Sequence, residues 1–508
     1  MNVPMLAEMA ADSLGDRVAV GRRGAGWTYD DLYSSARRAA TVITAEGAER
    51  VVLVDVNSEA VPLLLFGSGI AGVPFVPVNY RLPDAQLCAI LARTAPALAV
   101  GSEPILERIA GVEGITALSR DELHERVAKA SPAEPDFVDP ADIAVLLYTS
   151  GTTGDPKAAV LRHRHLASYV ISTVEFAGAG DHHAALVSVP PYHVAGVATI
   201  LTSVYGGRRL VYLPQFDPGG WVDLARSEAI THALVVPTML GRILDVVEDR
   251  GEQLPALVHL AYGGGRMPVP VIERAMALLP HVGFVNAYGL TETSSTISVL
   301  GPDDHRQALA SSDPDVRARL GSVGRPLPSV EVEIRGPDDG PLPAGQRGEV
   351  CVRGEQISGE YLEGSAVGPD GWFTTNDGGW LDDAGYLFVE GRLDDVIVRG
   401  AENISPGEIE DVLLDHPAVA DAAVVGIPDQ EWGEAIAAAV VLEPGTTASQ
   451  GELADWIRAR LRSSRAPAVV QIRDHLPYNE TGKLLRRVLR AELASQANTS
   501  SARSDLSL

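Results

Sequence analysis

The sequence predicts an α/β protein with a large N-terminal domain of parallel α/β layers, a small β-rich subdomain and a small α+β C-terminal domain. Over roughly the first 300 residues, apolar segments typical of buried strands alternate with segments of helical character. The strand-like segments include residues 50–54, 186–189, 209–213 and 232–236, and the helical ones include residues 29–46 and 269–279. Because this alternation is typical of strand–helix–strand units, we expect largely parallel sheets.

Two changes of pattern divide the rest of the chain. From about residue 321 to 390, short β-like runs lie between Gly and Pro turns, which predicts the β-rich subdomain. After Gly391, helical and strand-like runs alternate again, and a chain of 508 residues is too long for one core. We therefore expect an N-terminal domain over residues 1–392, a C-terminal domain over residues 393–494 and a disordered, Ser-rich tail over residues 495–508.

The composition is that of a folded protein with acidic character. Hydrophobic residues make up 46% of the chain, charged residues 21%, and the formal net charge is −26. This charge argues against nucleic acid and anionic membranes as partners, because both require a basic face. The two cysteines, Cys88 and Cys351, are too few for a disulfide framework and fit a reducing cytoplasm. Residues 61–78 are apolar but contain three prolines, so we expect a buried helix and strand rather than membrane insertion.

A loop rich in glycine and hydroxyl residues is the strongest functional signal. Residues 148–157 read YTSGTTGDPK and follow an apolar, strand-like run at residues 143–147. Glycines let backbone N–H groups approach an anion, hydroxyl groups add donors, and Lys157 adds a positive charge. The order of residues differs from the common P-loop, because Asp155 rather than lysine follows Gly154. A polyphosphate-binding loop is the favoured interpretation, and a plain surface turn is the alternative.

Four further blocks carry residues suited to nucleotide chemistry. Residues 286–293 read NAYGLTET, in which Tyr288 can stack on a base and Glu292 can hold Mg²⁺, although Thr291 as a helix cap is an adequate structural explanation. Residues 371–377 end in Asp377, which can accept hydrogen bonds from ribose hydroxyls or can form an Asx-turn. Residues 391–410 and 476–483 form the last two blocks, and a lone lysine such as Lys483 is more often a solvated surface residue.

The five blocks together resemble the adenylate-forming superfamily, and in particular its acyl-coenzyme A synthetases, over roughly residues 15–490. Within that family the chain looks most similar to aryl-coenzyme A ligases of the chlorobenzoate type. Three sequence features point there: Lys157 followed by two alanines, the Leu393-Asp394-Asp395 segment, and residues 429–433.

The resemblance implies a two-step ligase that uses ATP, Mg²⁺ and coenzyme A. A carboxylate attacks the α-phosphorus of ATP and releases pyrophosphate, and the thiol of coenzyme A then attacks the acyl-adenylate and releases AMP. Glu292 would place Mg²⁺ and Thr291 would bind the α-phosphate. By motif, the residues that would bind the nucleotide are Thr149, Ser150, Gly151, Thr152, Thr153, Gly154, Lys157, Gly264, Gly265, Tyr288, Gly289, Asp377 and Arg392.

The resemblance also implies a mobile C-terminal domain. Lys483 would bridge the substrate carboxylate and the α-phosphate in the first step, where positioning and charge stabilisation do most of the chemistry. Rotation about the hinge residue Asp394 would then remove Lys483 and bring residues 398–403 to the site. The residues expected to bind coenzyme A are Arg399, Gly400, Ala401, Glu402, Trp432 and Arg465, with core packing as the alternative for Trp432.

The expected acyl pocket is lined mostly by small side chains. His193 would act as a gate near the substrate carboxylate, and a histidine satisfied within the core is its alternative. The positions that resemble pocket walls are Val170, His193, Val194, Ala195, Gly263, Ala287, Ser294 and Ser295. We therefore expect a bulky cyclic, aromatic or extended carboxylic acid, or its acyl-adenylate, as the substrate.

Three departures from the family pattern keep other functions open. Arg266 lies in the loop expected to flank adenine, where it would contact phosphate or crowd the nucleotide. Ala401 stands where a glycine is common in the pantetheine loop, and Arg465 is the residue that would compensate for missing basic groups near coenzyme A. The alternatives are an enzyme of one half-reaction, a stand-alone adenylation enzyme that loads a carrier protein, and a nucleotide-sensing module. The oligomeric state is open, with a homodimer as one alternative.

Overall fold

The computed structural model describes residues 1–134, 136–149, 156–400, 402–429, 432–478 and 484–504. The chain divides into two compact units. Unit 1 comprises Met1–Gly264, Val271–Val332 and Val352–Phe373, and unit 2 comprises Gly265–Pro270, Glu333–Cys351 and Thr374–Leu508. Thus about half of the expected β-rich subdomain groups with the C-terminal residues, which differs from the boundary expected near Arg392.

Two large sheets form unit 1, and their central strands are parallel, as the sequence predicts. Within the described residues, the first sheet has nine strands, in the order β15 (Arg325–Pro326), β14 (Ser295–Leu300), β13 (Gly283–Leu290), β12 (His259–Gly263), β11 (His232–Val235), β9 (Ala184–Val187), β10 (Arg209–Tyr212), β1 (Val18–Arg22) and β2 (Ala25–Thr28). Antiparallel strands β2, β14 and β15 lie at its edges.

The second sheet carries the strands on both sides of the phosphate loop. Its eight strands within the described residues follow the order β19 (Gly364–Ser365), β18 (Glu360–Tyr361), β8 (Lys157–Arg162), β7 (Ile143–Thr149), β4 (Phe75–Pro77), β3 (Val51–Val54), β5 (Ala97–Gly101) and β6 (Ile115–Ser119). Strands β7, β4, β3, β5 and β6 run parallel, whereas β8 and β18 are antiparallel additions at one edge.

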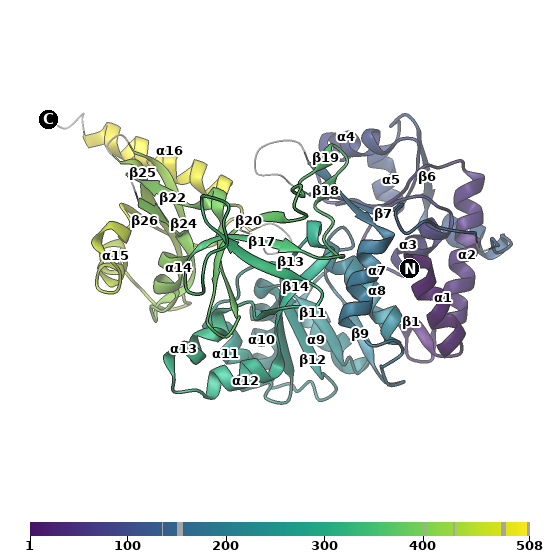
Figure 1. Ribbon diagram of the computed structural model, residues 1–508, viewed down its shortest axis with the longest axis horizontal. Helices are drawn as coiled ribbons and strands as arrows, with labels where there is room; N and C mark the ends of the chain where they lie inside the picture. Colours follow the sequence, from purple (N-terminus) through teal and green to yellow (C-terminus); the bar gives the residue numbers. More distant parts are fainter. Residues whose placement is uncertain (135, 150–155, 401, 430–431, 479–483, 505–508) are drawn as a thin grey trace. The chain divides into compact units, whose positions relative to one another are not determined.

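Apolar helices fill the space between the two large sheets (Figure 1). One buried cluster joins residues of α1, α2, α3, α7 and α8 to residues of both sheets. Helix α3 is buried on every face, because its sequence is almost entirely apolar. The helices of this half of the chain are α1 (Val3–Leu14), α2 (Tyr29–Ala45), α3 (Ala60–Ile70), α4 (Asp84–Thr94), α5 (Glu103–Ile109), α6 (Arg120–Lys129), α7 (His163–Thr173), α8 (Val194–Gly206), α9 (Pro218–Ser227), α10 (Pro237–Arg250), α11 (Val269–Leu278), α12 (Pro302–Ala310) and α13 (Pro314–Ala318).

Two smaller sheets complete the fold. The first has, in order, β16 (Glu331–Arg335), β17 (Gly348–Arg353), β20 (Phe373–Leu381) and β21 (Leu387–Arg392). The second contains β23 (Glu402–Ile404), β22 (Ile397–Arg399), β25 (Gly433–Leu442) and β24 (Val419–Asp429), with β26 (Val469–Arg473) parallel to β25. Short 3₁₀ turns are η1 (Thr291–Thr293), η2 (Arg319–Gly321), η3 (Leu393–Asp395) and η4 (Ser463–Arg465).

The C-terminal sheet is covered on both faces, because its central strands are apolar on both sides. Alternate residues of β24 and β25 face α14 (Pro406–Leu414) and α15 (Gln450–Arg458), and the intervening residues face α16 (Arg486–Ser504) (Figure 1). Helix α16 continues through residues 495–504, where we expected disorder. Good helix formers at residues 490–498 favour this extension.

No helix among the described residues is long and apolar enough to cross a membrane. The apolar stretch at residues 61–78 instead forms most of α3 followed by β4, as the sequence analysis expected.

Candidate active site

The two ends of the phosphate loop are held by a strand pair. Strands β7 and β8 run antiparallel with Thr149 directly opposite Lys157, and the Thr149 hydroxyl donates to the Lys157 carbonyl at 3.4 Å. Lys157 is exposed, so its ammonium group is accessible to a ligand. The predicted loop residues Ser150, Gly151, Thr152, Thr153 and Gly154 lie outside the described residues.

The predicted metal ligand Glu292 lies in the tight turn η1. The Glu292 carbonyl accepts two hydrogen bonds, from the backbone N–H groups of Ser358 and Gly359, each at 2.9 Å. The carboxylate Oε1 of Glu292 accepts a short hydrogen bond from the Tyr361 hydroxyl. Both the backbone and the carboxylate of this turn are therefore fixed by one segment that is distant in sequence.

The turn also depends on close backbone packing. A Cβ atom at Gly289 would lie 1.9 Å from the Ser295 carbonyl oxygen, so only glycine fits there. Inside the turn, the Thr293 hydroxyl donates to the Ser295 carbonyl at 2.7 Å and accepts from the Leu290 N–H at 2.9 Å. Thr291 is the first residue of the 3₁₀ turn, and Leu290 rather than Thr291 occupies the N-cap position.

Tyr361 brings the phosphate-loop lysine and the Glu292 turn together. It lies on β18, which pairs with β8 so that Tyr361 is opposite Ala159, two residues beyond Lys157. The Lys157 ammonium nitrogen lies 5.6 Å from the centre of the Tyr361 ring, within cation–π range. A cation suited to phosphate and a carboxylate suited to Mg²⁺ therefore converge on one tyrosine, although they are 135 residues apart in the chain (292 minus 157).

The residues of this cluster fit a magnesium ion that is bound mainly by a nucleotide. No group of three or more His, Cys, Asp or Glu side chains among the described residues is arranged to hold a metal. Mg²⁺ usually takes one or two carboxylates together with phosphate oxygens and water, so the single carboxylate of Glu292 suits it. The hydrogen bond from Tyr361 uses one of the two carboxylate oxygens.

Strands β12 and β13 position the predicted adenine-binding residues of unit 1. Gly263 pairs with Ala287, and a Cβ atom at Gly263 would lie 2.3 Å from the Ala287 carbonyl oxygen, so glycine is required there. Gly264 has a positive φ of 76°, which turns the chain away from the strand. Tyr288 is half-buried on β13 at an irregularity between Tyr288 and Gly289. Gly265, the third glycine of this loop, is exposed and belongs to unit 2.

The predicted acyl-pocket residues differ in accessibility. His193 is the N-cap residue of α8, its ring lies 4.8 Å from the Tyr192 ring, and the ring is half-buried. Val194, Ala195 and Ala287 are also half-buried, as side chains near a substrate need to be. Val170 and Ser294, by contrast, are 0% exposed, so protein groups cover both side chains. Ser295 and Gly263 are buried too.

In unit 2, Asp377 and Arg392 face each other across β20 and β21. The Arg392 guanidinium donates to the Thr375 carbonyl at 2.8 Å and to the Asp377 carboxylate at 3.4 Å. Asp377 is only 6% exposed. The predicted hinge residue Asp394 is exposed in η3 and accepts a hydrogen bond of 2.6 Å from the Asn376 side-chain amide.

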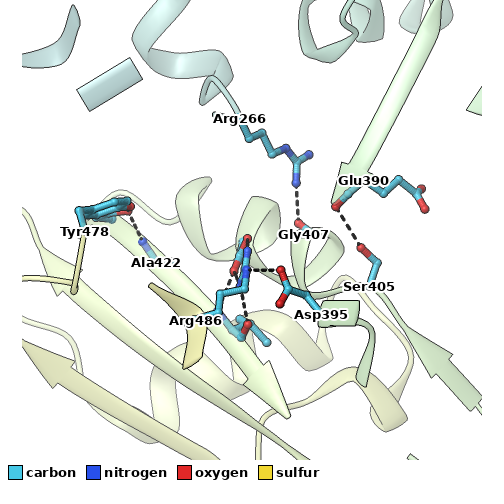
Figure 2. A network of polar contacts seen from close by, with 11 residues as sticks. Arg266, Glu390, Asp395, Ser405, Gly407, Ala422, Tyr478 and Arg486 are labelled. Atoms are coloured by element: carbon cyan, nitrogen blue, oxygen red, sulfur yellow. Dashed lines mark hydrogen bonds and ion pairs between the residues drawn. The ribbon is translucent and has the colours of Figure 1, made fainter. Parts of the chain in front are cut away.

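Arg266 contacts protein groups instead of projecting freely (Figure 2). Its guanidinium donates to the Gly407 carbonyl at 3.0 Å and pairs closely with Asp411, both on α14. Close by in the same unit, Arg486 forms a bidentate ion pair with Glu410 at 2.6 and 2.9 Å and lies 3.4 Å from Asp395 (Figure 2).

The predicted coenzyme A residues that the structure describes all lie in unit 2. The Arg399 guanidinium lies 5.5 Å from the centre of the Trp432 ring and donates to the Ser464 carbonyl at 2.7 Å. Trp432 is 46% exposed, which excludes core packing as its role. Gly400, with a φ of 65°, donates its N–H to the Trp432 carbonyl at 2.7 Å.

Arg465 was expected to compensate for missing basic groups near coenzyme A, but in the structure it contacts carboxylates of the protein. It pairs with Glu402 at 2.6 Å and Glu408 at 3.2 Å, and its side chain is only 14% exposed. Ala401 and Lys483, the predicted catalytic lysine, lie outside the described residues.

The sequence analysis missed Tyr361 and the residues around it. Gln356 is fully buried and its side-chain amide donates to the carbonyls of Thr293 and Thr296 at 3.1 and 2.8 Å. No local pattern marks these positions, because their role depends on strand pairing between β18 and β8.

Comparison with known proteins settles the family. The AMP-binding enzyme family matches residues 7–362, and the AMP-binding enzyme C-terminal domain matches residues 408–483. The chain belongs to the AMP-binding enzyme family. It is an AMP-forming enzyme of the acyl-coenzyme A synthetase type, and the predicted relationship to the adenylate-forming superfamily is confirmed.

Relatives of this AMP-binding enzyme align along nearly its whole length. A fatty acid–[acyl-carrier-protein] ligase, ScoC of Streptomyces coeruleorubidus, is 33% identical, over 93% of this chain and 92% of that protein. A feruloyl-CoA synthase of an Amycolatopsis species is 32% identical, over 93% of this chain and 95% of that protein.

A solved structure agrees with this assignment. The o-succinylbenzoate CoA synthetase MenE of Bacillus subtilis, in complex with its acyl-adenylate intermediate, has a TM-score of 0.81 and 26% identity over 96% of this chain and 97% of that chain. The same protein has been solved with ATP and a magnesium ion. The narrower resemblance to chlorobenzoate ligases stays a prediction.

Proposed function

We propose that this enzyme is a complete acyl-coenzyme A ligase that carries out both adenylation and thioester formation on a bulky carboxylic acid. The observation that supports adenylation is the convergence of Lys157 and Glu292 on Tyr361. A cation and a carboxylate at this spacing suit the phosphates and the metal of a magnesium nucleotide.

In the first step, a carboxylate oxygen attacks the α-phosphorus of ATP and pyrophosphate leaves. Thr149 and Lys157, held opposite each other on β7 and β8, bind the leaving phosphates together with the loop between them. Glu292 would hold Mg²⁺, which would supply positive charge to the phosphate oxygens. Thr291 binds the α-phosphate, and Lys483 stabilises the negative charge that develops there.

The remaining nucleotide contacts orient the base and the sugar. Tyr288 stacks on adenine beside the loop of Gly264, and Gly289 allows the close turn that follows. Asp377 accepts hydrogen bonds from the ribose hydroxyls, and Arg392 holds the Asp377 carboxylate in place from the neighbouring strand. These contacts fix the α-phosphorus relative to the acid, and positioning of this kind supplies much of the rate acceleration in phosphoryl transfer.

In the second step, the coenzyme A sulfur attacks the acyl carbon and AMP leaves. Rotation about Asp394 exchanges Lys483 for residues 398–403. Trp432, exposed and backed by the Arg399 guanidinium, offers an aromatic surface for the coenzyme A adenine. Arg399 is the basic residue of this cluster, because Arg465 is already paired with Glu402 and Glu408.

A bulky acid is supported by the half-buried residues among the predicted pocket positions. Val194, Ala195 and Ala287 are small or medium in size and are not fully covered by protein. Small side chains leave room for a cyclic or aromatic acyl group, whereas larger apolar side chains would fill that room.

The test separates the two half-reactions. Enzyme, ATP and Mg²⁺ are incubated with a panel of benzoates, hydroxycinnamates, fatty acids and polycyclic acids, and pyrophosphate is followed before coenzyme A is added. The expected result is pyrophosphate release with a cyclic acid, followed by a thioester detected by mass. A thioester formed only from synthetic acyl-adenylate, with no pyrophosphate from any acid, would contradict a complete ligase.

A carrier protein as acyl acceptor is the second candidate, because ScoC is a ligase of this kind and aligns over most of the chain. The same assay with a phosphopantetheinyl carrier protein in place of coenzyme A distinguishes the two. Faster acyl transfer to the carrier protein than to free coenzyme A would establish the second candidate.

A further inference from the structure

A six-residue segment, residues 356–361, connects the phosphate-loop strand to the Glu292 turn; we call it the strap. At one end, the Gln356 side chain holds the carbonyls of Thr293 and Thr296. In the middle, the N–H groups of Ser358 and Gly359 hold the Glu292 carbonyl. The strap therefore holds the backbone of the turn at Glu292 and at the residues that follow it.

The other face of the strap is bound to β8. The Ser358 hydroxyl donates a short hydrogen bond to the Val160 carbonyl, and the N–H of Leu362, next to the strap, donates to the Ala158 carbonyl at 3.0 Å. Glu360 forms a bidentate ion pair with Arg162, also on β8, at 2.6 and 2.8 Å. These contacts fix the distance between the strand that carries Lys157 and the turn that carries Glu292.

Backbone geometry keeps the strap in this conformation. Gly359 has a φ of 51°, and a Cβ atom there would lie 2.5 Å from the Val367 side chain. A substituted residue would strain the backbone and displace its neighbours, so the strap cannot easily take another path. Gln356 is 0% exposed and Ser358 is 6% exposed, so the first half of the strap is part of the protein interior.

Tyr361, at the end of the strap, contacts both predicted ligand-binding residues, Glu292 and Lys157. Its hydroxyl donates to Glu292 Oε1, and its ring faces the Lys157 ammonium group at 5.6 Å. Both contacts are made by a neutral side chain, so they orient the two charges without cancelling either of them. A carboxylate accepts at several lone-pair positions, so a metal can share Glu292 with the tyrosine hydroxyl.

We propose that Tyr361 is a positioning residue of the magnesium–nucleotide site, whose hydroxyl orients the Glu292 carboxylate toward the metal and whose ring holds the Lys157 ammonium toward the phosphates. This inference rests on the proposed adenylation function and adds a residue to it. Hydrogen-bonded partners of metal ligands typically contribute about 10–100-fold to metal affinity or activity. The hydroxyl and the ring act on different ligands, so separate substitutions distinguish their effects.

The experiment measures ATP binding to the full-length protein by calorimetry, once with Mn²⁺ as the metal probe and once in EDTA. No acid is added, so no turnover occurs. The metal-dependent ratio is the dissociation constant of ATP in EDTA divided by that with Mn²⁺. It reports how much the metal strengthens ATP binding. The variants are Tyr361→Phe, Tyr361→Leu, Glu292→Gln and the double variant Tyr361→Phe/Glu292→Gln. Tyr33→Phe is the matched control, because the Tyr33 hydroxyl also hydrogen-bonds a glutamate, Glu8, elsewhere in unit 1.

For Tyr361→Phe we expect the metal-dependent ratio to fall about tenfold while ATP affinity in EDTA is unchanged. Tyr361→Leu should in addition weaken ATP binding in EDTA by several-fold, because it removes the ring beside Lys157. In the double variant, Tyr361→Phe should add nothing to the loss from Glu292→Gln, because the hydroxyl acts through that carboxylate.

Two results would overturn the inference while leaving the proposed function intact: a normal ratio in Tyr361→Phe, or an undiminished effect of Tyr361→Phe in the Glu292→Gln background. If Glu292→Gln itself left the ratio unchanged, both the inference and the proposed metal role of Glu292 would fall. Thermal unfolding of each variant checks folding. Should Tyr361→Phe unfold, Glu292→Asp removes the same hydrogen bond by shortening the acid, and an unchanged ratio in that variant would equally overturn the inference.

Discussion

The strap of unit 1 holds the Glu292 turn through neutral groups, whereas the arginine network of unit 2 holds α14 through charged ones. Around Glu292, the holding groups are neutral: backbone N–H groups, the Gln356 amide and the Tyr361 hydroxyl. Around α14, they are charged: Arg486 pairs with Asp395 (Figure 2) and with Glu410, and Arg266 pairs with Asp411.

This difference shows which charges remain for a ligand. Lys157 and Glu292 are oriented by an uncharged tyrosine, so the field of each charge remains available to phosphate and metal. In the arginine network, the charges offset one another and serve to join α14, β24 and α16. The chain has a net charge of −26, so a site for an anionic substrate needs charges that are held by neutral groups. A lysine already paired with a protein carboxylate would attract phosphate poorly.

The largest expected effect tests whether Lys483, a charged residue of unit 2, also acts on the ligand. Lys483→Ala should slow adenylation by about 10² or more, as for other lost stabilisers of developing charge. Pyrophosphate release measures this step. Thioester formation from preformed acyl-adenylate is the internal control and should be largely spared. An equal fall in both steps would contradict the domain alternation.

The next effect tests how strongly the arginine network depends on charge. Arg486→Met leaves Glu410, which is 7% exposed, without its bidentate partner. The free energy of unfolding should fall by about 2 kcal/mol, below the usual range for buried pairs because the Arg486 side chain is 23% exposed.

The matched control for that variant is Arg490→Met, which removes an ion pair with Glu434 from a side chain that is 48% exposed. It should cost about 0.5 kcal/mol or less. Urea unfolding measures both variants, and equal losses would mean that burial does not set the strength of these pairs.

A smaller effect tests how a buried, uncharged histidine of unit 1 makes the stability of the protein depend on pH. His163 is 2% exposed, and its Nδ1 accepts a hydrogen bond from the Val3 N–H at 3.3 Å. Burial lowers the pKa of His163 to about 4 from 6.5. The unfolded chain therefore binds a proton that the folded one does not, so stability is complete above pH 6.5 and is lost as pH falls toward 4.

Between pH 7.5 and pH 5.5, His163 alone should contribute a loss of about 1.4 kcal/mol. His163→Asn keeps an acceptor but does not titrate, so the variant should lose less stability than the parent over this range. His281→Asn, at an exposed position, is the control and should keep the parental dependence. Parallel curves for His163→Asn and the parent would show that another group dominates the acid response.

The smallest effect tests whether Arg266 serves the fold or the nucleotide. Its guanidinium is used by Gly407 and Asp411, and both ion-pair side chains are nearly half exposed, at 44% and 49%. Arg266→Gln should therefore cost at most about 1 kcal/mol of stability. ATP affinity, measured in EDTA, should stay unchanged. A loss of ATP affinity of tenfold or more would instead support the phosphate contact that the sequence suggested.

Local sequence patterns were sufficient for the elements and for the chemistry of most motifs. The apolar segments around residues 51–54, 184–187 and 232–235 form parallel strands, because a strand buried on both faces requires a continuous apolar run. Lys157 and Glu292 are predicted as nucleotide-site residues from the residue types around them, since glycine, hydroxyl and charged residues rarely gather after a strand without a ligand.

Long-range pairing could not be predicted in the same way. Tyr361 acquires its position from the pairing of β18 with β8, across about 200 residues of chain. The partners of Arg266 and Arg465 could not be predicted either, because a guanidinium on a loop is as suited to phosphate as to a carboxylate of the protein. The extension of α16 beyond residue 494 also went unpredicted, because serine-rich composition outweighed local helix propensity in the sequence analysis.

The sequence by itself determined the α/β architecture and the family, and it predicts the residues that face a nucleotide, because these depend on short apolar periods and compact motifs. Only the tertiary structure decided which charged side chains are paired within the protein and which remain available to a ligand. Lys157 and Glu292 remain oriented by neutral groups, whereas Arg266, Arg465 and Arg486 are paired with carboxylates. The reason is physical: the effect of a charge depends on what lies within a few ångströms of it, and folding alone sets those neighbours.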